Sequence, residues 1–331
     1  MYTDLQYRKM FRAIKNGMEV NDLCDLLSLK ELEIYGLVEA LNIRGYDISI
    51  SEINDKKIIC KKNIVRTTKH IKPEIEDLNH IKICVVSDTH LCTNIQQLGL
   101  LNEVYKEAYN RKIKTFLHCG DLLDGDFTKI RPDQNYQLFR RGFDEQTMYA
   151  VEMYPYIEGA RTFFIEGSHD QTHVKNGGAT PGLWISKLRD DMIYLGTPEA
   201  VIELGNVKIK MQHPGGGCAR SLSYKPQIAI DEMDSNDKPN IFLQGHFHKS
   251  YGGVYRNVHF WLVPSFMNQS GFMKLNNLKS IVGAYFMDIY ADKKGHIEYI
   301  DVDPFIYDKN DIDENDYKYV KALKSTFLSL P

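Results

Sequence analysis

The chain has 331 residues, of which 43% are hydrophobic and 26% charged, a composition ordinary for a soluble globular protein. Its net charge of −3 gives no overall attraction to nucleic acid or to an anionic membrane, so any basic binding surface has to be local. The sequence holds no apolar run of about 18 residues, which excludes a membrane-spanning helix.

The cysteines and the N-terminus indicate the compartment. Six cysteines are present, none in a C-x-x-C pair, and the first residues lack the apolar stretch of a secretory signal. We therefore expect reduced thiols and a cytoplasmic protein with no membrane partner. The oligomeric state stays open.

Residues 1–62 predict a small domain that opens with three short helices. Apolar residues recur at helical spacing near the N-terminus, again over 20–27, and a third time over 34–41. Ser28 is the expected N-cap of the third helix, because Glu31 follows it as in a capping box.

Two strands, over 46–50 and 56–62, complete a layout that resembles winged helix-turn-helix domains by pattern alone. Residues 1–72 carry 13 basic and 10 acidic side chains, and the candidate recognition helix is rich in glutamate, a poor surface for a phosphate backbone. The basic side chains of the wing are Lys56, Lys57, Lys61 and Lys62. Nucleic-acid binding and a protein-contact role are both open for this domain.

The rest of the chain predicts a linker, a large domain and a tail. Residues 63–80 are polar, contain one proline and are the expected linker. Over residues 81–305, short apolar strands alternate with helical patterns, which predicts an α/β domain with a mixed sheet or two stacked sheets. The first expected strands are 81–86, 113–119 and 162–166, separated by helices over 98–109 and 139–154. Residues 306–331 form an acidic and then amphipathic tail, expected to cap the domain rather than to bind a partner.

Five short motifs occur in one order, most of them directly after an expected strand. They are Asp88-Thr-His90, Gly120-Asp121-Leu-Leu-Asp124, Gly167-Ser-His169-Asp170, His213 and Gly245-His246-Phe-His248. Because ligands gather past the carboxyl ends of strands in sheets with helical connections, we expect one edge to collect them. Carboxylates and imidazoles together are the ligand set of a two-metal hydrolase.

These motifs resemble those of the calcineurin-like metallophosphoesterase superfamily, over about residues 81–300. The resemblance implies a double β-sandwich flanked by helices, with a dinuclear metal centre. In the implied ligand set, Asp88, His90 and His248 hold one metal, Asp121 bridges both, and His213 and His246 hold the other.

The third motif carries the proton donor and one departure. The resemblance implies that His169 donates a proton, that Asp170 orients it, and that Asp124 has a supporting role. The family usually has asparagine before this histidine, whose amide oxygen binds the second metal, whereas this chain has Ser168. A hydroxyl is a weaker neutral ligand, so we expect a looser second site. The expected cofactor is a pair of divalent ions, Mn²⁺ first, with Fe²⁺, Zn²⁺ or Ni²⁺ as alternatives.

The predicted function is a metal-dependent phosphoesterase that hydrolyses phosphodiester bonds, with nucleic acid as the expected substrate. Residues 213–269 are similar to phosphoesterases of the DNA-repair nuclease type and their viral relatives. The aromatic candidates for stacking on bases are Phe247, Trp261, Phe266 and Phe272, although core positions are commoner for such residues. Two alternatives stay open. One is a phosphatase or nucleotide phosphodiesterase whose N-terminal domain binds partners, and the other is a DNA-binding or assembly protein with a degenerate site.

Overall fold

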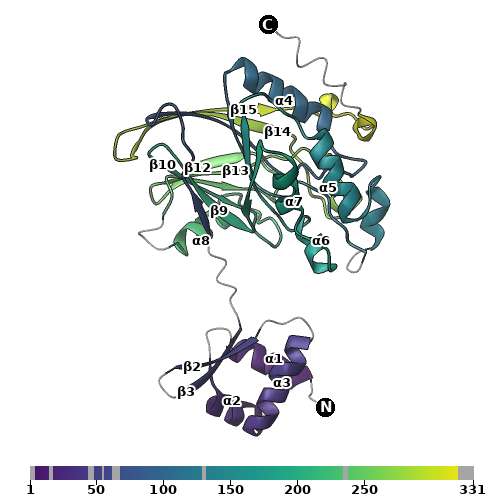
Figure 1. Cartoon of the computed structure of the whole chain (residues 1–331), viewed down its shortest axis with the longest axis vertical. Helices are drawn as coiled ribbons and strands as arrows, with labels where there is room; N and C mark the ends of the chain where they lie inside the picture. Colours follow the sequence, from purple (N-terminus) through teal and green to yellow (C-terminus); the bar gives the residue numbers. More distant parts are fainter. Residues whose placement is uncertain are drawn as a thin grey trace. The chain divides into compact units, whose positions relative to one another are not determined.

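The computed structural model describes residues 4–14, 18–43, 48–53, 56–61, 68–128, 132–233 and 238–319. The chain divides into two compact units, Met1–Thr67 and Thr68–Pro331 (Figure 1). Among the described residues, no helix combines the length and the apolar character needed to span a lipid bilayer.

The smaller unit holds three helices and a three-stranded antiparallel sheet of order β1-β3-β2. The helices are α1 (Asp4–Ala13), α2 (Val20–Leu27) and α3 (Glu31–Ile43), and the strands are β1 (Met18–Glu19), β2 (Ile48–Ile53) and β3 (Lys56–Lys61). One apolar core joins the helices to the sheet, with Leu23, Ile34 and Ile59 fully buried. The small unit therefore has a core of its own.

The capping role predicted for Ser28 is wrong. Ser28 lies at the C-cap of α2 with φ 51°, in the left-handed region that ends helices. The carboxylate of Glu33 instead accepts the amide hydrogen of Lys30 at 2.8 Å, one residue before α3 begins.

The larger unit contains two six-stranded sheets, which confirms the predicted mixed α/β fold. One sheet has the order β12-β13-β11-β10-β9-β4 and is built from β4 (Lys69–Ile71), β9 (Glu199–Leu204), β10 (Val207–Gln212), β11 (Ile241–Gln244), β12 (Tyr251–Tyr255) and β13 (Val258–Leu262). The other has the order β15-β14-β5-β6-β7-β8 and is built from β5 (His80–Val86), β6 (Thr115–His118), β7 (Arg161–Ile165), β8 (Met192–Gly196), β14 (Gly283–Ala291) and β15 (Ile297–Ile306).

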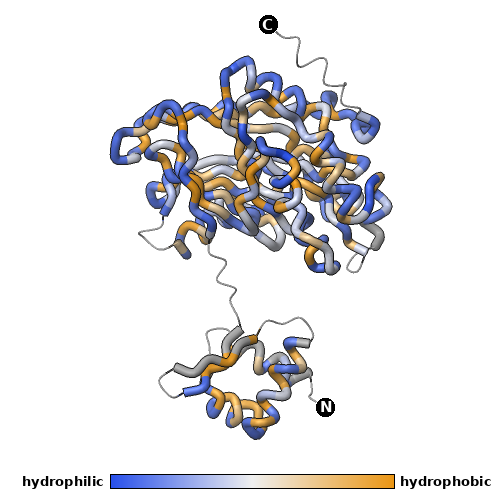
Figure 2. The backbone as a smooth tube through the Cα atoms, viewed as in Figure 1, coloured by the Kyte–Doolittle hydropathy of each residue, from blue (hydrophilic) through white to orange (hydrophobic). Residues whose placement is uncertain are grey.

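Helices flank the sheets, and two large apolar cores result, beside a small cluster between α8 and the first sheet. The helices are α4 (Leu98–Asn110), α5 (Gly142–Met153), α6 (Gln171–Lys175), α7 (Pro181–Leu188), α8 (Tyr224–Asp231) and α9 (Gly271–Leu275), with 3-10 turns η2 (Pro132–Gln137), η3 (Lys309–Asp311) and η4 (Asp316–Lys318). One core joins residues of both sheets, and the other packs α4, α5 and α7 on the second sheet. Figure 2 shows hydrophobic stretches along the inner strands, which carry the apolar runs read from the sequence.

Part of the expected linker belongs to the larger unit. Residues 69–71 form β4, which pairs in parallel with β9, and the hydroxyl of Thr68 donates to the carboxylate of Glu199 at 2.7 Å. Only Ile71 of this strand turns partly inward, so its sequence lacks the apolar alternation that marks a strand.

The C-terminal residues pack against α4. The carboxylate of Asp316 accepts the amide hydrogens of Leu98 and Gly99, each at 2.6 Å, and thereby caps a helix whose own N-cap side chain makes no capping bond. Residues 320–331, which hold most of the predicted amphipathic stretch, lie outside the described residues.

Replacing Asp316 by alanine leaves two amide groups at the start of α4 without their acceptor. We expect the free energy of unfolding of the larger unit to fall by about 1–3 kcal/mol. Urea denaturation of the full chain measures this change. Glu314→Ala, at an exposed neighbouring position, is the control and should stay within about 0.5 kcal/mol of the parent. Equal stability of the two variants would contradict the capping role.

Candidate metal centre

Parallel strands bring the first two motifs together. β5 and β6 run in parallel, and their backbone pairing continues beyond the strands. The amide of Asp88 donates to the carbonyl of Gly120 at 2.9 Å, and that of His90 donates to the carbonyl of Asp121 at 3.1 Å. The two aspartates therefore lie side by side past the carboxyl ends of their strands, as predicted.

The other sheet supplies the remaining histidines. His213 follows β10, and His246 and His248 follow β11, which pairs in parallel with β10. The amide of His246 donates to the Asp88 carboxylate, 2.9 Å from Oδ2, and so joins the turns of the two sheets. All six expected ligand residues thus meet at one place.

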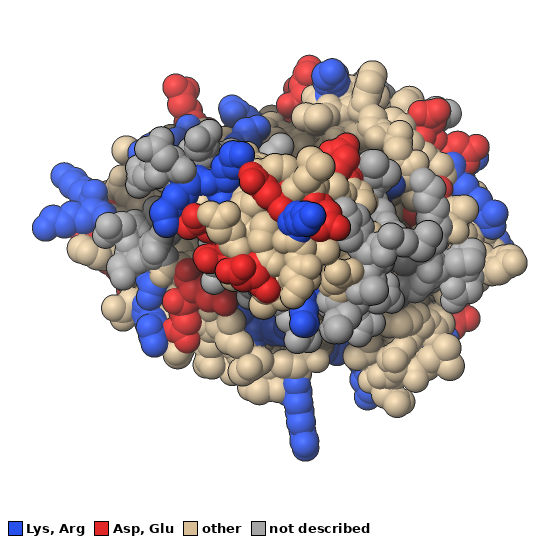
Figure 3. Space-filling view, turned by 90° about the horizontal axis from the view of Figure 1, so that it is seen from below, with Lys and Arg blue, Asp and Glu red and all other residues tan. Residues whose placement is uncertain are grey.

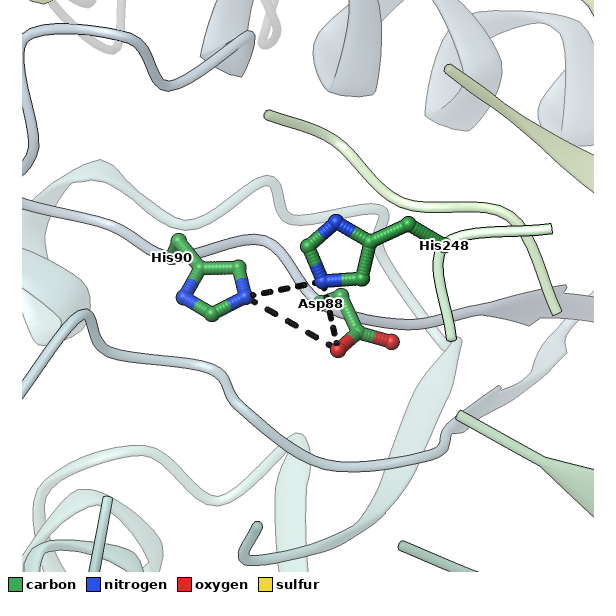
Figure 4. A group of neighbouring side chains, drawn as sticks. All are labelled: Asp88, His90 and His248. Carbon is green, nitrogen blue, oxygen red and sulfur yellow. Dashed lines mark hydrogen bonds and ion pairs between the residues drawn. The ribbon is translucent and has the colours of Figure 1, made fainter. Parts of the chain in front are cut away.

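Asp88, His90 and His248 form the first ligand group (Figure 4). The Nε2 atoms of His90 and His248 lie 3.7 and 3.2 Å from Asp88 Oδ1, and 3.3 Å from each other. All three residues are buried. Figure 4 shows both imidazoles with one ring nitrogen directed at the carboxylate.

Asp121, His213 and His246 form the second ligand group, in which one ligand atom of each residue lies within 4.8 Å of the others. His213 Nε2 is 3.0 Å from Asp121 Oδ2 and 4.0 Å from Asp88 Oδ1. Because His90 Nε2 is also 3.9 Å from Asp121 Oδ2, the two aspartates lie between the histidines of both groups.

The His213 side chain shows that these residues fit a cation. Its Nδ1 lies 2.8 Å from the carbonyl of Cys119, which can only accept, so Nδ1 carries a hydrogen. Its Nε2 is buried and, despite the 3.0 Å separation, is not aligned for a hydrogen bond with Asp121. Once Nε2 has lost its proton, its lone pair faces a carboxylate oxygen, an arrangement that a divalent cation between them stabilises.

The pKa shifts of the site also support a bound cation. Burial alone would raise the pKa values of Asp88 and Asp121, but the imidazoles around them, foremost His248 and His213, hold both well below the usual range. Burial alone would lower the pKa of His90, but Asp124 and Asp88 raise it to about 10. Asp121 and Asp88 likewise raise the pKa of His213 to about 9 against its burial. His90 and His213 therefore hold protons that a bound cation would displace.

The backbone is strained at the ligands. Positive φ values occur at Asp88 (51°), His90 (41°), Asp121 (52°), His246 (76°) and His248 (53°). Non-glycine residues rarely adopt this region, and each such residue costs on the order of 1–3 kcal/mol. Strain of this kind, gathered at one cluster, supports a functional site over a merely structural one.

The motif glycines make room for the ligands. A Cβ atom on Gly120 would lie 2.4 Å from Nδ1 of His213, and one on Gly167 would lie 2.2 Å from Oδ1 of Asp121. Alanine at either position would therefore displace a ligand side chain.

His169 lies beside the second group and is held by Asp124. Its amide donates to Asp121 Oδ1 at 2.7 Å, and its Nδ1–H donates to the carbonyl of Asp124 at 2.8 Å. The carboxylate of Asp124 also lies 3.0 Å from Nδ1 of His90, which directs Nε2 of His90 into the first group. Asp124 thus supports one ligand and the expected proton donor without facing either group directly.

The orienting role expected for Asp170 is wrong. Its buried carboxylate accepts the amide hydrogens of Leu122, Leu123 and Gly167, at 3.2, 2.8 and 2.9 Å. Asp170 therefore ties the second motif to the third through the backbone, and Asp124 takes the contact with His169. The sequence could not show whether Asp124 or Asp170 contacts His169, because both aspartates lie in motifs of the same site.

Ser168 lies at the margin of the second group, with its hydroxyl oxygen 3.5 Å from Asp121 Oδ2. Three further positioning contacts were missed from the sequence. They are the Cys119 carbonyl on His213, the Ser280 hydroxyl 3.3 Å from Nδ1 of His248, and the Ser87 hydroxyl 2.5 Å from Asp88 Oδ2. Ser87 and Cys119 each adjoin a motif, whereas Ser280 lies in no motif and next to none.

A comparison with models of protein families identifies the family of this chain. A sequence model described as calcineurin-like phosphoesterase matches residues 81–284. An archaeal phosphodiesterase structure covers 69% of this chain and 100% of its own, at 14% identity and a TM-score of 0.38. A zinc complex of Vps29 from Entamoeba histolytica covers 68% and 99%, at 15% identity and a TM-score of 0.34. A search of curated proteins finds no match.

Metal binding should release protons. Because His90 and His213 have pKa values of about 10 and 9, they are protonated at pH 7.5, and a cation must displace those protons to bind. We expect Mn²⁺ affinity to rise between pH 7 and pH 9, with release of about one to two protons per protein. Isothermal titration calorimetry in buffers of different ionisation enthalpy counts them.

The control is His296→Asn, at an exposed position outside both groups, which should leave the proton count unchanged. Binding that is independent of both pH and buffer would contradict the protonation assigned to these ligands.

Proposed function

The chain belongs to the calcineurin-like phosphoesterase family. We propose that it hydrolyses phosphodiester bonds with two divalent cations and that nucleic acid is its substrate. The protein is a metal-dependent hydrolase of phosphoesters, as its family is. The observation that carries the finer proposal is the meeting of two three-residue ligand groups at the carboxylates of Asp88 and Asp121.

Two cations fit this arrangement better than one. Each ligand group has one carboxylate and two imidazoles, and each aspartate has an oxygen within 4.0 Å of a histidine of the other group. When bound, two divalent cations would neutralise the phosphate oxygens and lower the pKa of a water molecule. Asp121 is the proposed bridging ligand. Mn²⁺ is the cation we propose first, because the ligands mix nitrogen with oxygen donors.

Ser168 supports a second site of lower affinity. Its hydroxyl is 3.5 Å from Asp121 Oδ2, so a serine oxygen stands near the second group where the family usually has an amide oxygen. The hydroxyl is a weaker donor than an amide, and Asp121, His213 and His246 remain as the principal ligands.

His169 is the proposed general acid. Its Nδ1–H is engaged by the Asp124 carbonyl, so Nε2 is the atom left to protonate a leaving oxygen. The side chain is 26% exposed, so a substrate can reach it. The carboxylate of Asp124 also lies 3.3 Å from Nδ1, so both oxygen-bearing groups of Asp124 fix the orientation of the ring.

The basic side chains of the small unit bear on the proposed nucleic-acid substrate. Two wing lysines are paired within the small unit, Lys56 with Glu19 at 2.9 Å and Lys57 with Glu31 at 3.0 Å. The side chain of Lys61 and all of Lys62 lie outside the described residues. Figure 3 shows acidic and basic side chains interspersed on the face it displays.

These ion pairs favour the alternative in which the small unit contacts a protein partner, although such exposed pairs are weak enough to open. The third alternative, an assembly protein with a degenerate site, is disfavoured by the complete set of carboxylate and imidazole ligands.

Asp88→Asn should abolish Mn²⁺-dependent activity on every substrate, because it removes a charged ligand held between both groups. We expect at least about a 1000-fold loss in kcat/KM. The measurement is a Mn²⁺ titration against labelled single- and double-stranded DNA, a nucleotide and a monoester. Full activity in Asp88→Asn would refute the site, and cleavage of the nucleotide alone would replace nucleic acid by a small substrate.

His169→Asn should distinguish a general acid from a binding residue. Cleavage of a dinucleotide phosphodiester needs protonation of an alkoxide, so we expect a loss of about 100-fold or more in kcat. Hydrolysis of bis(p-nitrophenyl) phosphate releases a stable phenolate and should fall by less than about tenfold. His70→Asn, at an exposed position on β4, is the matched control. An equal loss on both substrates would count against the proton-donor role.

A further inference from the structure

A cavity of about 460 Å³ is lined in part by Asn94 and Ile95, a few residues after the first motif, and it has no role in the chemistry described so far. Its walls come from the loop after β5, from η2, from the segment around α9 and from the C-terminal residues. The polar and aromatic side chains that line it include Asn94, Tyr136, Gln137, Asn268, Gln269 and Tyr317. Cavities of this volume accommodate small organic groups.

The walls share their backbone with the first ligand group. The carbonyl of Asp88 accepts the amide hydrogen of Phe266 at 3.0 Å, and the amide of Asn268 donates to the carbonyl of Ile95 at 2.8 Å. The chain from His90 turns directly into the Asn94 wall, where the amide of Asn94 donates to the carbonyl of Gln137 at 2.8 Å. A group bound in the cavity is therefore attached to the same turns that hold the ligands.

The third ligand of the group is linked as well. The hydroxyl of Ser280 lies 3.3 Å from Nδ1 of His248 and donates to the carbonyl of Met267 at 2.8 Å, next to Asn268. Contacts from Asp88, His90 and His248 thus all lead into the wall of the cavity.

The lining favours a neutral heterocycle over a second phosphate. Carboxamides offer a donor and an acceptor each, which complements the edges of nucleobases. Within the described part of the chain, the side chains of Asn94 and Gln137 have no hydrogen-bond partner and are available. Two acidic residues, Asp313 and Glu314, face the single cation of Lys274 in the lining, a balance that disfavours an anion.

Tyr136 supplies an aromatic surface. Its side chain is 84% exposed although it lines the cavity, and an exposed tyrosine ring is a platform on which a base can stack. Two aromatic residues considered for this role from the sequence, Phe247 and Phe266, are instead buried.

We propose that this cavity is a subsite for a nucleobase of the substrate, bound by the carboxamides of Asn94 and Gln137 and by the ring of Tyr136. The inference rests on the proposed function, since it places the base of a nucleotide next to the phosphate at the metal centre. It identifies nucleosidic phosphoesters as the substrate class.

Calorimetric binding of AMP and of ribose 5-phosphate to the Mn²⁺-loaded full chain tests the subsite, because the two ligands differ only in the base. We expect AMP to bind at least about tenfold more tightly, and this advantage to fall below about threefold in Tyr136→Ala, Asn94→Leu and Gln137→Leu. The leucine variants keep side-chain volume and remove hydrogen bonding. Tyr299→Ala, at a 58% exposed tyrosine on β15, is the matched control and should retain the advantage.

Hydrolysis of bis(p-nitrophenyl) phosphate is followed in parallel as a report on the metal centre, and it should be unchanged in Tyr299→Ala. Equal affinity for AMP and ribose 5-phosphate in the parent, or an advantage that survives in all three cavity variants, would overturn the subsite. A parent protein that binds AMP preferentially but hydrolyses no diester would instead contradict the proposed function and leave the subsite standing.

Discussion

Two carboxylates with almost no exposure to solvent, Asp88 and Asp121, impose the constraint on which the larger unit depends. A buried charge is costly unless it is paired, and here the pairing groups come from both sheets, His90 from one and His213 and His248 from the other. The ligand groups are therefore complete only when the two sheets are packed on each other. The apolar core between the sheets is thus as much a part of the metal centre as the ligands are.

Backbone strain is concentrated at the ligand residues, which adopt conformations that their local sequence does not favour. Five ligand residues have positive φ, and a side chain on Gly120 or Gly167 would strike His213 or Asp121. Regular strands end just before these residues, and the parallel backbone pairing continues beyond them. The strain is tolerated because the surrounding sheets fix the turns. The strained conformations direct the ligand atoms toward common points.

The ligands could be predicted from the sequence because they follow apolar strands at short and fixed spacing. β4 could not, because a strand at the sheet edge with one inward residue has no periodic signal. The contacts of Asp124 and Asp170 also escaped prediction, since which aspartate faces His169 depends on how two separate turns lie against each other. The contact of Ser280 with His248 could not be predicted either, because Ser280 lies in no motif and 32 residues after His248 in the sequence.

Chemistry and recognition are carried by different kinds of segment. The ligands lie on short turns that parallel pairing holds in one conformation, so their geometry leaves little freedom for change. The cavity beside them is walled by η2, α9 and the C-terminal residues, which join it from distant parts of the sequence. Such connecting segments vary without disturbing the sheets. Ser280 contacts both His248 and the carbonyl of Met267, which adjoins Asn268 in the lining, so one ligand and the cavity wall are joined through a few contacts. Substrate choice can therefore differ between proteins of one fold while the reaction stays the same.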